Sequence, residues 1–142
     1  MRDFLMGTAQ TQSSSINFSL LLLRIYFGLS MVFAHGLGKL PPSLGFINST
    51  KQLGFPLPEI FAWAAGLSEF VGGLFIALGL FTRPSAFFLA ITMGVAAFLR
   101  HGPDSYSIKE KAILYFVVAI ALLITGSGKY GIDGMFQQSR RY

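Results

Sequence analysis

The sequence predicts an all-α fold, a membrane-spanning up-down bundle of four helices, in a single domain of residues 1–142. Three observations favour it. The chain is 53% hydrophobic and only 12% charged, about half the charged fraction of a soluble domain, so lipid is the expected solvent. Its apolar residues gather in four long segments. Turns that contain proline or glycine separate these segments, and helices joined by short turns pack antiparallel.

The four helices are expected at residues 17–40, 59–81, 84–101 and 109–127. The apolar runs of the first two helices reach the roughly 20 residues that a spanning helix needs. Those of the last two are shorter, and helix tilt or local bilayer thinning would accommodate them. Polar tails are expected at residues 1–16 and 128–142.

The connections between the helices are marked by helix-breaking residues. Pro41-Pro42 ends the first helix, because proline cannot continue a helix and restricts the residue before it. Residues 41–57 then form a long connection, and its mixed apolar and polar middle predicts a short helix on the membrane surface. Gly79 to Pro84 forms a tight turn, and Arg100 to Lys111 forms a polar loop.

Net charge and cysteine content exclude several classes of function. The formal net charge is +5, but the basic residues lie at helix ends rather than on one face, so a nucleic-acid partner is not expected. Membrane lipid headgroups are the expected partners of these charges. The chain has no cysteine, which excludes thiol redox chemistry, iron–sulfur ligation and cysteine-based zinc sites.

Topology is weakly encoded in the sequence. The first apolar segment is expected to be a permanent span, because it has no small-residue cleavage site and carries Arg24 and His35. Five basic residues are expected on each side of the membrane, so the positive-inside rule does not choose an orientation. The free-standing Arg140-Arg141 pair favours cytoplasmic termini.

Ionisable residues inside the apolar segments are the strongest functional signal. Arg24, His35 and Lys39 lie in the first segment, and Glu69 lies in the second. A charge at the bilayer centre costs roughly 2.5–3.5 kcal/mol, so such residues normally face the interior of a bundle. At about 100° per residue, the three residues of the first segment share one helix face.

A stripe of small residues on the second helix places Glu69 in a helix–helix seam. The stripe comprises Ala62, Gly66, Glu69, Gly73 and Ala77. Small residues at this spacing let two helices approach closely. Counting from the 41–57 connection, Glu69 is expected between His35 and Arg24, about 7–9 Å from each along the axis.

Three interpretations of Glu69 remain open at this point. A buried Glu69–Arg24 ion pair would fix the helix register. Alternatively, Glu69 and His35 form a catalytic pair that handles protons or a ligand. In the third interpretation, Glu69 faces a water-filled cavity and has no specific role.

A second group of polar residues is expected at one end of the bundle. The group would line a mouth for an anionic or quinone-like ligand and comprises His35, Lys39, Arg100, His101 and Glu110. The alternative is an ordinary belt of solvated headgroup contacts, which fits Arg100, Lys109 and Lys111 better.

At the opposite end, Arg83 and Asp133 are expected to form a structural pair that holds the tail. Haem is not an expected cofactor: His35 and His101 lie on one side, as axial ligands would, but each has a polar alternative. No metal site is expected.

Several motifs in order resemble the DoxX family of bacterial membrane proteins. They are Leu23-Arg24-Ile-Tyr-Phe-Gly28, His35-Gly36-Leu-Gly-Lys39, Glu69-Phe-Val-Gly72-Gly73, Leu78-Gly-Leu-Phe-Thr82-Arg83, Glu110, and Gly126-Ser-Gly128 followed by Asp133. The resemblance covers about residues 20–135. It implies a four-helix protein of the bacterial plasma membrane. It carries over by motif the positions Arg24, Lys39, Glu69, Arg83, Glu110 and Asp133.

One member of that family is named as the membrane subunit of an archaeal thiosulfate:quinone oxidoreductase, and others are associated with oxidative-stress or thiol-redox complexes. The resemblance therefore favours a membrane subunit of a redox complex linked to quinone. Glu69 and His35 would be catalytic, and Arg24, Lys39, His101 and Glu110 would bind the ligand. Without cysteine, the chain itself would not exchange sulfur.

Two alternatives remain: a non-enzymatic scaffold or assembly subunit, and a small-solute transporter. The transporter is disfavoured because the sequence has no inverted repeat. Other membrane subunits or a second copy of the chain are the expected protein partners. The terminal segments, including Arg140-Arg141-Tyr142, would pack on such a partner, and the outer faces of the last two helices would dock it through Phe87, Phe88, Phe98 and Phe116.

Overall fold

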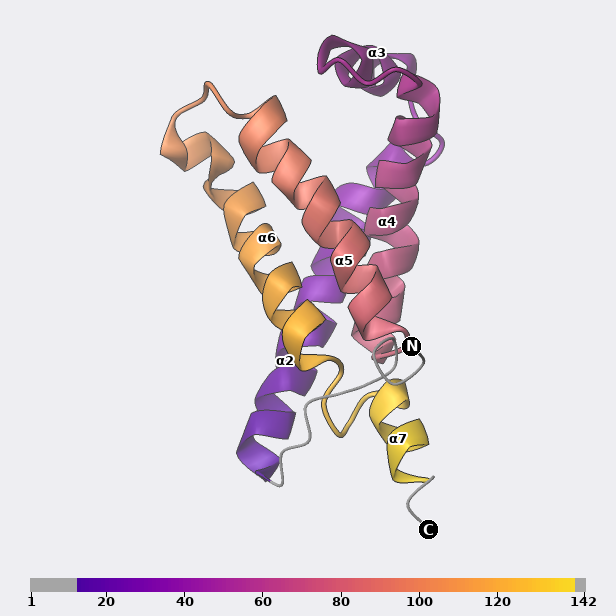
Figure 1. The fold of residues 1–142 in the computed structure, drawn as a ribbon, viewed down its shortest axis with the longest axis vertical. Coiled ribbons are helices and arrows are strands. Elements are labelled where there is room, and N and C mark those ends of the chain that lie inside the picture. Colours follow the sequence, from indigo (N-terminus) through magenta and orange to yellow (C-terminus); the bar gives the residue numbers. More distant parts are fainter. Residues whose placement is uncertain (1–12, 140–142) are drawn as a thin grey trace.

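The computed structural model describes residues 13–139, which form helices joined by short turns and contain no strand (Figure 1). The α-helices are α2 (Ser14–Met31), α3 (Leu44–Gln52), α4 (Pro58–Leu78), α5 (Thr82–Gly94), α6 (Tyr106–Thr125) and α7 (Ile132–Gln138). The predicted all-α class is confirmed. The predicted packing of Arg140-Arg141-Tyr142 on a partner and the polar start of the chain lie outside the described residues.

Two of the long helices continue with altered winding. After α2 the chain runs through a π-helical segment, Val32–Gly36, and a 3₁₀ turn, Leu37–Lys39. After α5 it runs through a second π-helical segment, Val95–Arg100. The first helix thus ends at Lys39, just before Pro41-Pro42, as predicted.

Three continuous helices are long and apolar enough to cross a membrane: Ser14–Lys39, Pro58–Leu78 and Thr82–Arg100. The fourth predicted span corresponds to α6, which has 20 residues but carries Lys109, Glu110 and Lys111 near its start. The described residues therefore support an all-α membrane protein with three candidate spans. The four-helix bundle is not confirmed, because six α-helices are present in the described part of the chain.

Helical structure extends into both segments that were predicted to be polar tails. The helix of the first span begins at Ser14 rather than at residue 17, because the side chain of Ser13 accepts a hydrogen bond from the backbone N–H of Ile16 and caps it. The C-terminal tail contains α7 and is not irregular throughout.

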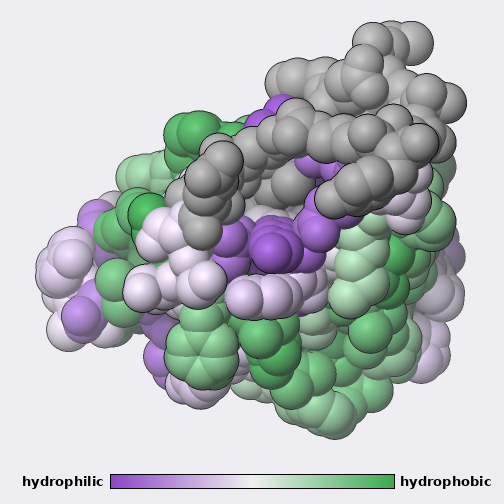
Figure 2. All heavy atoms as spheres, turned by 90° about the horizontal axis from the view of Figure 1, so that it is seen from below, coloured by the Kyte–Doolittle hydropathy of each residue, from purple (hydrophilic) through white to green (hydrophobic). Residues whose placement is uncertain are grey.

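The long helices pack around α4. It contacts α2 on one side and α5 on another, and α6 packs against α5. The core between them contains Phe27, Met31, Ile76, Leu89 and Leu122, all of which are buried. Hydrophilic residues gather over the α7 end of the molecule, whereas hydrophobic residues cover much of the adjoining flank (Figure 2).

The contact between α2 and α4 is made backbone to backbone. A Cβ atom added to Gly28 would lie 2.4 Å from the carbonyl oxygen of Gly73, and one added to Gly36 would lie 2.7 Å from the amide nitrogen of Phe70. On the predicted stripe of small residues, Ala62, Gly66, Glu69 and Gly73 are all buried. The predicted seam is therefore confirmed.

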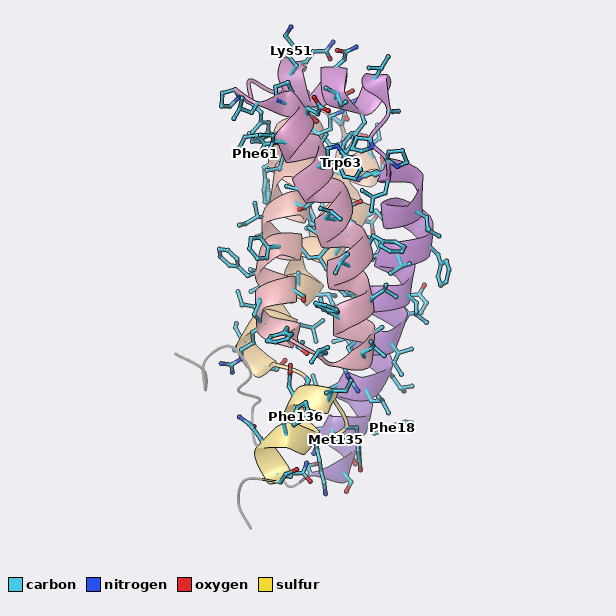
Figure 3. The ribbon with its side chains drawn as sticks, turned by 90° about the vertical axis from the view of Figure 1, so that its right-hand side faces the viewer. Phe18, Lys51, Phe61, Trp63, Met135 and Phe136 are labelled. Atoms are coloured by element: carbon cyan, nitrogen blue, oxygen red, sulfur yellow. The ribbon has the colours of Figure 1, made fainter. Side chains whose placement is uncertain are left out.

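The segment between the first two spans contains the predicted short helix. α3 is capped by Ser43, whose hydroxyl accepts from the backbone N–H of Phe46. It packs against α4 and lies at the end of the molecule where α4 begins (Figures 1 and 3). The first turns of α4 therefore extend past Lys39 and lie beside α3 rather than beside α2.

Candidate functional site

Lys39 and Glu69 form a close ion pair inside the helix assembly. The Nζ atom of Lys39 lies 2.6 Å from Oε1 of Glu69. The Glu69 side chain is 0% exposed, whereas that of Lys39 is 31% exposed. Glu69 thus faces inward, as predicted, and its partner is the last residue of the first span.

The predicted Glu69–Arg24 ion pair is wrong because the helix register differs from the one expected. Gly66 lies against the carbonyl oxygen of Lys39, 3.0 Å from its would-be Cβ atom, so Glu69 is level with the end of the first span. Arg24 packs against Gly79, ten residues farther along α4, which corresponds to about 15 Å.

Two polar atoms at this end are buried without a hydrogen-bond partner among the described residues. They are Oε2 of Glu69 and Nε2 of His35. Most buried polar atoms in proteins are satisfied, so each exception asks for an explanation. Both atoms belong to the residues that the sequence predicted to be catalytic.

His35 links this end of the seam to α6. It lies in the π-helical segment Val32–Gly36, and such segments frequently occur at functional sites. Its ring packs edge-to-face on Tyr115 with centroids 5.3 Å apart. Lys39 and Lys111 both act electrostatically on it. The site is therefore bounded by the first span, α4 and α6.

α3 lies next to Lys39 at this end of the helices. The Lys39 ammonium lies 5.3 Å from the centroid of the Phe46 ring, a cation–π distance. Thus one lysine side chain contacts the buried acid on one side and an aromatic ring of α3 on the other. We name Lys39, Glu69, His35, Tyr115 and Phe46 the Glu69 site.

The other predicted ligand-binding residues do not contact this site. His101 pairs through Nδ1 with Oδ2 of Asp104, 2.8 Å away, and Glu110 is exposed on α6. Arg24 lies at the opposite end. Within residues 13–139, no group of three or more histidine and acidic side chains is arranged to hold a metal ion.

Arg24 belongs to a second buried polar cluster. The residue is 2% exposed, and its guanidinium Nη2 donates to the carbonyl of Tyr130 at 2.5 Å. The Nε and Nη1 atoms have no hydrogen-bond partner among the described residues, while Asp133 acts on Arg24 electrostatically. Arg24 therefore holds the segment after α6 rather than a site in the seam.

Asp133 caps a helix that is distant in sequence. Its two carboxylate oxygens accept from the backbone N–H groups of Phe81 and Thr82, each at 2.9 Å. Phe81 has a left-handed backbone, with φ of 45°, and supplies no side-chain cap to α5. An acidic group here satisfies free N–H groups and opposes the positive end of the helix dipole.

Arg83 and Asp133, predicted to form a structural pair, each make contacts that fit a structural role, and their pairing with each other stays a prediction. The carboxylate of Asp133 binds the two backbone amides, and Arg83 donates to the carbonyl of Ile124 at 2.9 Å. The predicted effect, attachment of the tail, is achieved by the cap.

Sequence reasoning missed Tyr115, Phe46 and the cap. Tyr115 follows Lys111 by four residues on one helix face, so the spacing could have indicated a polar face of α6. The contact of Phe46 depends on how α3 folds over the end of the helices. The cap joins residues about fifty positions apart, and no local pattern signals it.

Comparison with known proteins places the chain in a family. The DoxX family model matches residues 19–102. An uncharacterized protein of Haemophilus influenzae is 29% identical over 114 residues, which cover 75% of this chain and 82% of that protein. The Bacillus subtilis protein named "Putative oxidoreductase CatD" is 29% identical over 122 residues, which cover 85% and 89% of the two chains. No solved structure matches. This chain, a membrane protein with a buried ion pair in its helix seam, belongs to the DoxX family.

Proposed function

We propose that this protein is an integral membrane subunit of a redox complex and that the Glu69 site binds a quinone headgroup. The observation that carries the proposal is the wholly buried carboxylate of Glu69, with one oxygen on Lys39 and the other without a partner among the described residues. The acceptor oxygen of Glu69 and the imidazole nitrogen of His35, both buried at the same end of the helices, suit a ligand that carries both a hydroxyl and a carbonyl group.

The charges of the site favour a neutral ligand. Lys39 and Glu69 cancel each other, so an anion would have to displace Glu69 from the ammonium. Reduction of a quinone takes two electrons and two protons and converts its two carbonyl groups into hydroxyl groups. Glu69 and His35 are titratable groups suited to pass those protons, and a redox partner subunit would supply the electrons.

The name of the Bacillus subtilis relative, "Putative oxidoreductase CatD", supports the redox assignment. We further propose that α6 is the fourth span, since its apolar residues after Lys111 pack on α5. In this arrangement the start of α2 and the end of α7 lie on the cytoplasmic side of the bacterial plasma membrane, and the α3 end lies on the opposite side.

Quinone binding by the purified protein tests the proposal. The protein would be extracted in mild detergent, its lipids analysed for quinone, and decylubiquinone binding measured by equilibrium retention in lipid nanodiscs. Glu69→Gln should weaken binding by about tenfold or more, because it removes a charged hydrogen-bond acceptor. Glu59→Gln, an exposed acid at the start of the same helix, is the matched control and should bind like wild type. The proposal would be refuted if no quinone is extracted with the protein and the protein does not bind added decylubiquinone.

A non-enzymatic scaffold is the second candidate, and one observation favours it. The Lys39–Glu69 pair ties the end of the first span to α4 beside the glycine contacts, so it could hold the helices together without a ligand. Under this alternative, Glu69→Gln would lower thermal stability and the recovery of co-purifying membrane subunits, and no quinone would be bound by wild type.

A further inference from the structure

Lys39 stands between water and a buried acid. Within the described residues, the carboxylate of Glu69 makes one hydrogen bond, from Lys39 to Oε1, and its side chain is 0% exposed. The Lys39 side chain is 31% exposed. Lys39 is therefore the group that contacts both the carboxylate and the exterior at the α3 end.

The other charged and titratable groups around this pair are few. The first span brings His35, whose ring lies on Tyr115, and α6 also brings Lys111. α3 brings the Phe46 ring. α5 brings a hydroxyl, that of Thr92, which is hydrogen-bonded to Ser68 at 2.9 Å. None of these groups is hydrogen-bonded to Glu69.

We propose that Lys39 is a proton-relay residue through which Glu69 exchanges protons with the aqueous phase at the α3 end. This inference rests on the proposed site but not on the identity of its ligand. It assigns a direction to the site: protons enter from the side that carries α3 and Lys51, and not from the side that carries α7.

The step needs no group beyond those present and water. The Lys39 ammonium transfers a proton along its 2.6 Å hydrogen bond to Oε1 of Glu69, so one N–H bond breaks and one O–H bond forms. The resulting amine takes a proton from a hydronium ion at its exposed side, which leaves a water molecule and restores the ammonium. One proton has then moved from water to Glu69, which can pass it to the oxygen of a ligand.

Phe46 keeps the lysine in this position. The electron-rich face of an aromatic ring attracts a cation, which favours the ammonium near the Glu69 carboxylate over a fully solvated one. α3 thus covers the relay without blocking it.

Infrared spectroscopy of the protein in lipid nanodiscs tests the proposal without any quinone. A rapid drop in pH would be followed by the appearance of the carbonyl stretch of a protonated carboxylic acid, and Glu69→Gln would identify the band that belongs to Glu69. Lys39→Arg keeps the positive charge, but a guanidinium does not release its proton in proteins. It should slow the appearance of the Glu69 band by about a hundredfold.

A second substitution of Lys39 and two control substitutions of exposed lysines complete the test. Lys39→Met should slow the same band, whereas Lys51→Met on α3 and Lys129→Met at the opposite end should leave it unchanged, since both lysines are exposed and away from Glu69. A wild-type rate in Lys39→Arg, with its thermal stability preserved, would overturn the relay. If wild type binds no quinone but the Glu69 band appears more slowly in Lys39→Arg, the proposed ligand is refuted and the relay is supported.

Discussion

Arg24 and Tyr130 lie 106 residues apart, and a hydrogen bond of 2.5 Å joins the guanidinium Nη2 of the first to the carbonyl oxygen of the second. The segment after α6 is held to α2 at a second point, where the backbone N–H of Lys129 donates to Oδ1 of Asn17 at 2.8 Å. One end of the first span is thus fastened to the C-terminal segment, and the other is fastened to α4 by Lys39.

The Asp133 cap should matter for stability. Asp133→Ala removes the acceptor for two backbone N–H groups of the α5 start, and loss of a helix cap costs about 0.5–2 kcal/mol. Asp133→Asn should cost less, because its amide oxygen can still accept. Thermal unfolding in detergent would measure both. Met135→Ala on the exposed face of α7 is the control, and equal losses in Asp133→Ala and the control would contradict the cap.

The glycine contact between α2 and α4 should not tolerate a methyl group. Gly28→Ala would place Cβ 2.4 Å from the Gly73 carbonyl oxygen, and overpacking of this kind costs about 1–3 kcal/mol. Gly38→Ala has nothing within 4 Å of its Cβ and should leave the melting temperature within error of wild type. A tolerated Gly28→Ala would mean that the two helices are farther apart than described.

The two members of the ion pair should not be equivalent. Lys39→Met leaves a carboxylate that is fully buried, whereas Glu69→Gln leaves an ammonium that can turn toward water. Lys39→Met should therefore cost more, up to about 3 kcal/mol, because an unpaired buried charge is expensive. The double variant Lys39→Met/Glu69→Gln should recover part of the loss.

The dependence of this loss on pH has a definite sign. Since the loss comes from a charged carboxylate, it should shrink as the pH falls and Glu69 takes up a proton. Stability curves of Lys39→Met and of Lys51→Met, the surface control, would be compared over pH. A loss that grows toward low pH would contradict the assignment.

The depth of α4 in the bilayer can be read from the single tryptophan. Trp63 is 40% exposed and lies on α4 near the α3 end (Figure 3). Lipids brominated near the headgroup should quench its fluorescence more than lipids brominated near the chain end. Trp63→Phe/Val71→Trp moves the probe eight residues along α4, about 12 Å deeper, and should reverse the order. Equal quenching in both proteins would show that α4 does not cross the membrane.

The absence of cysteine allows a direct test of whether α6 spans. Pro103→Cys is placed before α6 and Lys129→Cys after it, both at exposed positions. A membrane-impermeant maleimide added to intact spheroplasts should label one variant and spare the other until the membrane is opened. Labelling of both variants from the same side would show that α6 does not cross the bilayer.

Long apolar segments separated by helix-breaking turns were enough to predict the all-α class, and the placement of charge in those segments was enough to predict the inward position of Glu69. The free-energy cost of placing a charge in the membrane applies to each residue separately, so it can be inferred from the sequence around that residue. The stripe from Ala62 to Ala77 could be read for the same reason, since helical spacing alone brings small residues to one face.

The partner of Glu69 could not be predicted in this way. Counting depth from the connection assumed that the first two spans begin level, but α3 packs beside the first turns of α4 and shifts Glu69 to the level of Lys39. The π-helical segment Val32–Gly36 also changes the angle between His35 and the preceding turns. Both effects arise from tertiary packing, which a uniform helix period does not contain.

The cap supplied by Asp133 has a consequence for biosynthesis. A ribosome makes the α5 start about fifty residues before it makes Asp133. The backbone N–H groups of Phe81 and Thr82 therefore lack this acceptor while α5 and α6 are being synthesised. The corner between α4 and α5 is therefore completed only after Asp133 has been made. A chain truncated before Asp133 should leave this corner protease-sensitive, and a chain extended through α7 should protect it.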